Sequence, residues 1–68
     1  MGRVNISLKA ARANAGMTQK EWAKCLDVTV DTVLNWETGK SEPKYTQLRK
    51  ISELSGIPMD YIFVPVKS

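Results

Sequence analysis

Apolar residues recur along the chain three and four positions apart, which is the spacing of a helix with one buried face. The clearest stretch contains Val30, Val33, Leu34 and Trp36. The β-branched run at 28–30 also suits a strand, but the capping threonine and the spacing favour a helix. The pattern therefore predicts a largely helical chain with short connections.

Capping residues divide the chain into about five short helices. Serine or threonine stands before each of the first three, and glycine follows the first, third and fourth. The predicted helices are 8–14, 18–26, 29–38, a segment with Leu48, Ile51 and Leu54 that closes at Ser55 and Gly56, and a short last helix from Pro58 that Pro65 stops. We expect 3–6 and 63–66 to be extended.

The length of 68 residues predicts a single domain, residues 1–68, and 43% hydrophobic residues are enough for a globular fold. One cysteine and no histidine exclude an internal disulfide and a four-ligand zinc site. Chains this small usually need such a link or well-packed helices. We therefore expect close helical packing, self-association or both.

The composition also argues against an enzyme. Without histidine there is no Ser-His or Cys-His pair, and the four glycines stand singly instead of forming a phosphate loop. No stretch is long enough to span a membrane, and no secretory signal is evident. We expect a cytoplasmic protein with no cofactor, no metal and no small-molecule substrate.

Residues 18–38 have the plan of a helix-turn-helix, in which two helices cross over a turn of a few residues. The crossing leaves little room, so the first helix needs a small residue, and Ala23 stands there. The residues expected to fill the angle between the helices are Leu26, Val28, Val33 and Trp36. Trp22 and Trp36 each stand at helical spacing from other apolar residues of their own helix. Both are interpreted as core residues and not as platforms on which bases stack. The second helix is then free to enter a DNA major groove.

Four segments carry a resemblance to a known family. They are Met17–Gln19, Gln19–Ala23, Val33–Lys40 and Gly56–Phe63. Over 8–63, the chain resembles the Cro/C1-type repressors, also called the XRE or lambda-repressor-like family. The resemblance implies an all-α, compact five-helix domain whose second and third helices read DNA.

The resemblance also implies roles for individual residues. Those at phosphate-contacting positions are Thr18, Gln19, Thr29, Lys40 and Lys44, and those facing base edges are Val30, Asp31, Thr32 and Asn35. Arg12 and Glu37 match an ion pair that ties the first helix to the third.

The chain departs from the family pattern in two ways. Asp27 occupies the turn position where the family usually has glycine, although Asp tolerates left-handed backbone better than most residues. The second departure is the charge distribution. Residues 25–39 contain three acidic residues and no basic one, whereas basic residues lie on either side, in 1–24 and 40–50.

Each functional interpretation has a simpler alternative. Asn35 pairs with adenine or is a solvated polar residue, and Asp31 accepts from cytosine or only complements the helix dipole. Val30 contacts a thymine methyl or packs on Gln19. The lysines at 40 and 44 grip phosphates or only add solubility.

Two further features stay open. Cys25 is interpreted as a small, partly buried apolar residue and not as a redox sensor. The apolar end, 61–66, covers the core, forms a dimer interface or pairs as a strand with 4–6.

These features together predict a dimeric, sequence-specific DNA-binding transcriptional regulator. The expected type is a small phage or mobile-element repressor that reads a palindromic operator in double-stranded DNA. The alternative is a helix-turn-helix used mainly to bind a protein, such as an antirepressor or an antitoxin-like partner, because the predicted recognition helix is acidic.

Overall fold

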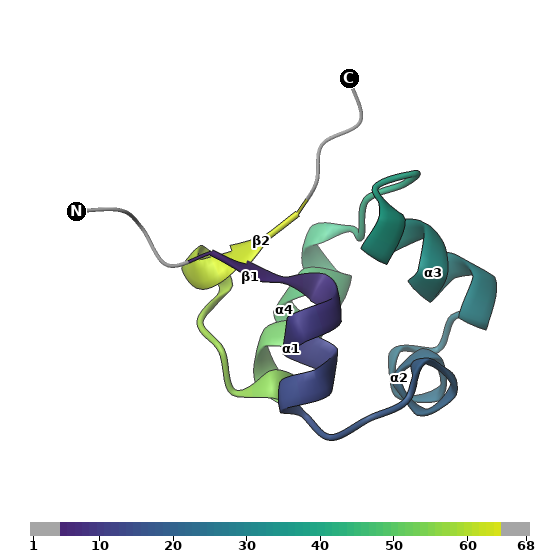
Figure 1. Ribbon diagram of the computed structural model, residues 1–68, viewed down its shortest axis with the longest axis horizontal. Coiled ribbons are helices and arrows are strands. Elements are labelled where there is room, and N and C mark those ends of the chain that lie inside the picture. Colours follow the sequence, from purple (N-terminus) through teal and green to yellow (C-terminus); the bar gives the residue numbers. More distant parts are fainter. Residues whose placement is uncertain (1–4, 65–68) are drawn as a thin grey trace.

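The computed structural model describes residues 5–64 and places four α-helices around one core (Figure 1). In chain order the elements are β1 (Ile6–Ser7), α1 (Leu8–Asn14), α2 (Gln19–Leu26), α3 (Val30–Thr38), α4 (Tyr45–Ser55), the 3-10 helix η1 (Met59–Tyr61) and β2 (Ile62–Phe63). The predicted boundaries of the first three helices agree with these to within one residue.

Side-chain caps fix where the first three helices begin. The hydroxyls of Ser7, Thr18 and Thr29 each accept a hydrogen bond from a backbone N–H three residues later, at 3.0–3.2 Å. At α2 the Glu21 carboxylate also accepts from the Thr18 N–H at 2.9 Å, which completes the predicted capping box. Because these donors have no partner inside the helix, each cap stabilises its helix by about 1 kcal/mol.

Asp27 allows the tight turn between α2 and α3. Its φ of 58° and ψ of 45° are left-handed, and it is the one residue other than glycine with positive φ among residues 5–64. The N–H of Val28 then reaches back to the Ala23 carbonyl at 3.0 Å and closes the end of α2. Aspartate therefore adopts the left-handed backbone of this turn, a conformation that favours glycine.

We expect Asp27→Ala to lower the free energy of unfolding by about 1 kcal/mol, because a Cβ-bearing residue without a short polar side chain is strained in left-handed backbone. Asp27→Gly, the control, should be at least as stable as the original chain. Urea unfolding followed by circular dichroism measures both. Equal stability of the alanine and glycine variants would contradict this account.

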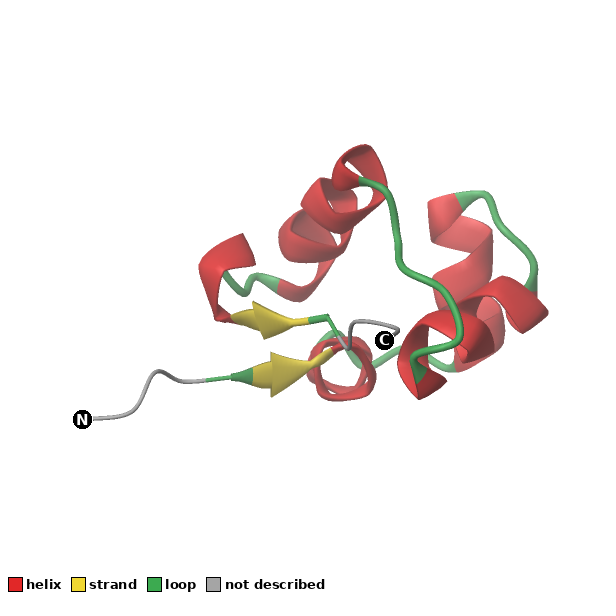
Figure 2. Ribbon diagram, turned by 90° about the horizontal axis from the view of Figure 1, so that it is seen from above, coloured by secondary structure: helices red, strands yellow, loops and turns green. Residues whose placement is uncertain are grey.

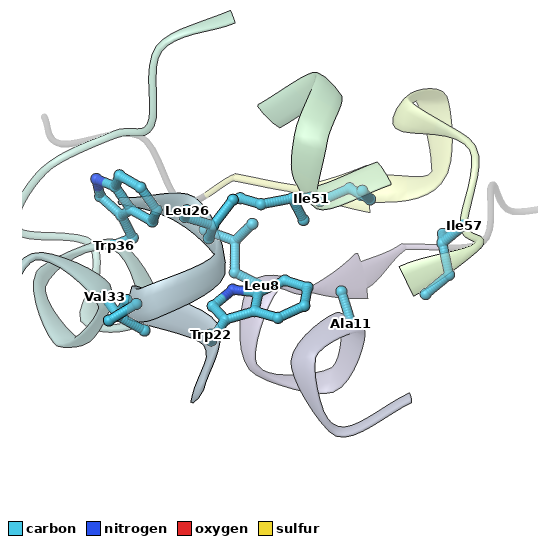
Figure 3. Close-up of a cluster of buried hydrophobic side chains, with 10 residues drawn as sticks. Leu8, Ala11, Trp22, Leu26, Val33, Trp36, Ile51 and Ile57 are labelled. Atoms are coloured by element: carbon cyan, nitrogen blue, oxygen red, sulfur yellow. The ribbon is translucent and has the colours of Figure 1, made fainter. Parts of the chain in front are cut away.

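The core brings together one face of every α-helix and β2 (Figure 3). Its buried members are Leu8, Ala11, Trp22, Ala23, Leu26, Val33, Trp36, Ile51, Ile57 and Ile62. Both tryptophans are core residues, as predicted, and Val28 packs against the cluster while partly exposed. Ala23 is buried, as the close crossing of α2 and α3 requires.

The end of the chain differs from the expected fifth α-helix. One turn of 3-10 helix, Met59–Tyr61, leads directly into β2, which pairs in parallel with β1 so that Ile6 lies opposite Ile62 (Figure 2). The strand-pairing alternative is therefore correct for Ile6. The structure has four α-helices in residues 5–64, and the expectations for 3–4 and 65–66 lie outside the described residues.

One prediction of burial was wrong, and one apolar residue of α3 lies outside the core. Cys25 is exposed, because it lies on the face of α2 that points away from the core residues Trp22, Ala23 and Leu26. Leu34 shares the apolar pattern of α3 but is 44% exposed, while Val33 beside it is fully buried. A helix of nine residues packed on one side has apolar positions that cannot all face inward.

Candidate nucleic-acid interface

Helix α3 runs along one edge of the molecule, on the far side of α1 from the strand pair (Figure 1). Val33 and Trp36 face the core, and Val30, Asp31 and Leu34 are exposed on its other side. The helix is nine residues long, or about 14 Å, and one face is free along its length. An exposed helix of this size fits a major groove about 12 Å wide.

A part-buried ion pair holds α3 against α1. The Arg12 Nε donates to Glu37 Oε2 at 2.7 Å, and the two side chains are only 13% and 5% exposed. Arg12 also donates to the Met17 carbonyl at 3.0 Å, so its guanidinium joins α1, the following loop and α3. Gln19 Nε2 donates to the other carboxylate oxygen of Glu37 at 3.2 Å. Helices α1, α2 and α3 are thus joined through one carboxylate.

The hydroxyls on α3 are largely engaged within the protein. Thr32 shares a 2.9 Å hydrogen bond with the capping hydroxyl of Thr29, and Thr38 donates to the Leu34 carbonyl at 2.9 Å. The half-buried Asn35 side chain forms no hydrogen bond with any residue in 5–64. The backbone carbonyl of Asn35 accepts a hydrogen bond from the Lys40 N–H at 2.9 Å. Asp31 and Asn35 therefore supply the free polar groups of the α3 surface.

The loop after α3 contains two exposed lysines. Gly39 ends α3 in left-handed backbone, with φ of 83°, and Lys40 follows it directly. Lys44 precedes α4 and donates its backbone N–H to the Gln47 side chain at 2.7 Å. Neither ammonium forms an ion pair with a carboxylate of residues 5–64. Both positive charges are available to an external anion.

A model of the helix-turn-helix family matches residues 8–62, which contain all four α-helices. The chain belongs to the Cro/C1-type helix-turn-helix family. It is 38% identical over 55 residues to the HTH-type transcriptional regulator ImmR of Bacillus subtilis strain 168, and the match covers 81% of the chain. The same match spans 43% of ImmR. No solved structure matches the chain.

The family positions assigned from the sequence lie in two groups. Thr29, Val30, Asp31, Thr32 and Asn35 are on or directly before α3, and Lys40 and Lys44 lie beyond its end. Thr18 and Gln19 stand at the start of α2. The structure thus brings the expected base-facing residues onto one helix, with the expected phosphate-facing residues around it.

Several of these side chains also have a structural role within the protein. The hydroxyls of Thr18 and Thr29 cap helices, and Gln19 binds Glu37. The capping pattern of the sequence already pointed to the threonines. The bond from Gln19 to Glu37 depends on how α2 and α3 cross, so it needed the tertiary structure.

Other site types find no support in the described part of the chain. Across 5–64 no group of three His, Cys, Asp or Glu side chains is placed to hold a metal ion. Nor does that range include a helix with the length and apolar character needed to cross a membrane.

Proposed function

We propose that the chain is a sequence-specific DNA-binding regulator of transcription that inserts α3 into the major groove. The observation that carries the proposal is the exposed face of α3. An ion pair fixes this helix to α1, and two lysines that have no ion-pair partner within 5–64 follow it in the sequence. Membership of the helix-turn-helix family and the similarity to ImmR, a transcriptional regulator by name, support it. A rigid, projecting helix beside positive charge suits a polyanion with readable edges.

In this proposal, bases and phosphates are contacted by different groups. Val30, Asp31, Thr32 and Asn35 face the base edges. The groups that set the position on the backbone are Thr18, Gln19, Thr29, Lys40 and Lys44. The two lysines, which have no ion-pair partner within 5–64, support the second assignment because lysine–phosphate contacts supply essentially all of the non-specific affinity for DNA.

We further propose that the protein binds a palindromic operator as a homodimer and represses transcription, as a small phage or mobile-element repressor does. One α3 of about 14 Å covers only a few base pairs, so a monomer would read a short and common sequence. A dimer places two such helices about 34 Å apart, on half-sites one helical turn apart. We propose no enzymatic activity.

Titration of a labelled random DNA duplex at increasing salt, read by fluorescence anisotropy, tests the proposal. With about four to six phosphate contacts per dimer, the logarithm of the association constant should fall with the logarithm of salt with a slope near −4 to −5. Negligible binding at low salt would overturn the proposal. It would favour the alternative of a protein partner, for which the specific observation is the acidic and apolar surface of α3.

Asn35→Ala should weaken binding to a selected operator by about tenfold or more and leave random DNA almost unaffected. The reason is that an amide paired with adenine contributes about 1–3 kcal/mol of discrimination and little to non-specific affinity. Anisotropy with both duplexes measures the difference. Equal losses on the two would mean that Asn35 does not read a base.

A further inference from the structure

Two exposed apolar side chains lie next to each other on the outer face of α3. Val30 is 40% and Leu34 is 44% exposed, and residues four apart on a helix are neighbours on its surface. Neither contributes to the buried core. Two adjacent apolar side chains on the proposed reading surface can contact an apolar group of a ligand.

The hydrogen-bonding groups around this pair narrow the choice of ligand. Helix α3 contains no arginine or lysine, so it cannot form the two-bond contact with guanine that is the commonest specific contact in the major groove. The Thr38 hydroxyl, one turn beyond Leu34, donates to a backbone carbonyl. Asp31, next to Val30, is exposed and only accepts when ionised, which suits the amino group of a base and repels carbonyl edges.

We propose that Val30 and Leu34 form a contact site for the 5-methyl group of a pyrimidine, and that Leu34 is a specificity-determining residue. The 5-methyl of thymine is the one apolar group that unmodified base pairs present in the major groove. Lys40 and Lys44 beyond the end of α3 provide the charge complementarity that would hold this apolar pair against DNA. This inference rests on the proposed function. It adds the kind of base edge that α3 selects.

The test starts from duplexes selected by the full chain from a random pool. In the selected duplex, thymine is replaced by uracil within each half-site, which removes only the methyl group. Burial of one methyl group corresponds to about fourfold in affinity, so loss of one per half-site should raise the Kd of a dimer by about fifteenfold. An unchanged Kd on the uracil duplex would overturn the inference.

A double-mutant cycle connects the methyl group to the side chain. Leu34→Ala, which retains helix propensity, should bind the thymine and uracil duplexes with almost equal Kd. Val30→Ala should lose part of the discrimination. Tyr61→Ala is the matched control, since Tyr61 is 46% exposed but lies outside α3, and its ratio of Kd values should equal that of the original chain. A Leu34 variant that still discriminates between the duplexes would contradict the assignment.

A further set of duplexes distinguishes the two bases that can carry a 5-methyl group, thymine and 5-methylcytosine. Replacement of a contacted thymine–adenine pair by cytosine–guanine should weaken binding, and 5-methylcytosine at the same place restores affinity if the methyl group alone is read. Restoration supports a methyl contact from either base, and no restoration supports a contact with thymine in particular. If no duplex is selected and random DNA does not bind, the proposed function itself fails. Selection followed by indifference to uracil overturns only the methyl contact.

Discussion

Glu37→Ala should lower the free energy of unfolding by about 3–5 kcal/mol, because it leaves the Arg12 guanidinium without its charged partner in a part-buried site. Glu37 is only 5% exposed and accepts hydrogen bonds from both Arg12 and Gln19. A domain of this size usually has only about 3–5 kcal/mol of stability. The variant should therefore be largely unfolded at 25 °C. Circular dichroism and the fluorescence of the two buried tryptophans would measure this loss.

Matched variants distinguish the cost of leaving one charge without its partner from the cost of lost side-chain packing. Arg12→Ala should be destabilising for the same reason, whereas Arg12→Ala combined with Glu37→Ala should cost less than the sum of the single changes. Glu37→Gln retains the shape and an acceptor oxygen, so its loss should be smaller than that of alanine. Strict additivity of the two alanine changes would show that the 2.7 Å contact contributes no coupling.

Replacement of both Lys40 and Lys44 by alanine should weaken binding to random DNA by more than tenfold at low salt. It should also reduce the salt slope by about two per monomer, since each phosphate contact accounts for about one unit. The two ammonium groups have no carboxylate partner within residues 5–64, so their removal should leave the fold intact. Anisotropy over a range of salt concentrations gives both the affinity and the slope.

The control for this pair has the same change in net charge at other places. Lys9 and Lys24 are exposed on α1 and α2, and their joint replacement by alanine also removes two positive charges. If Lys40 and Lys44 contact phosphates directly, the control should retain most of the slope. Equal effects of the two pairs would mean that net charge, not position, governs the affinity.

Much of the fold is predictable because its signals are local. The caps at Ser7, Thr18 and Thr29 fix three helix starts through atoms three residues away, which any single sequence contains. The buried residues Trp22, Val33 and Trp36 follow from helical spacing in the same way. The helix-turn-helix is identifiable from one continuous segment for this reason.

The last turn shows where local signals fail. Apolar residues after Pro58 fit a short helix. Pairing between β1 and β2 instead gives hydrogen-bond partners to backbone groups that a single helical turn would leave without one. That pairing joins Ile6 to Ile62, which are 56 positions apart, so local spacing does not predict it. Periodicity likewise assigns Val33 and Leu34 to one apolar pattern, and only the packing of α3 against α1 and α2 buries one and exposes the other.

The sequence by itself therefore determined the first three helices, the turn and the family, because each is encoded within a few neighbouring positions. Only the tertiary structure decided which side chains of the helix-turn-helix form hydrogen bonds within the protein and which are exposed. In the folded chain, Gln19 donates a hydrogen bond to Glu37, and the Thr29 and Thr32 hydroxyls share a hydrogen bond. Val30 and Leu34 are exposed on the outer face of α3. The physical reason is that exposure and hydrogen bonding depend on how the helices cross, and that depends on the whole core.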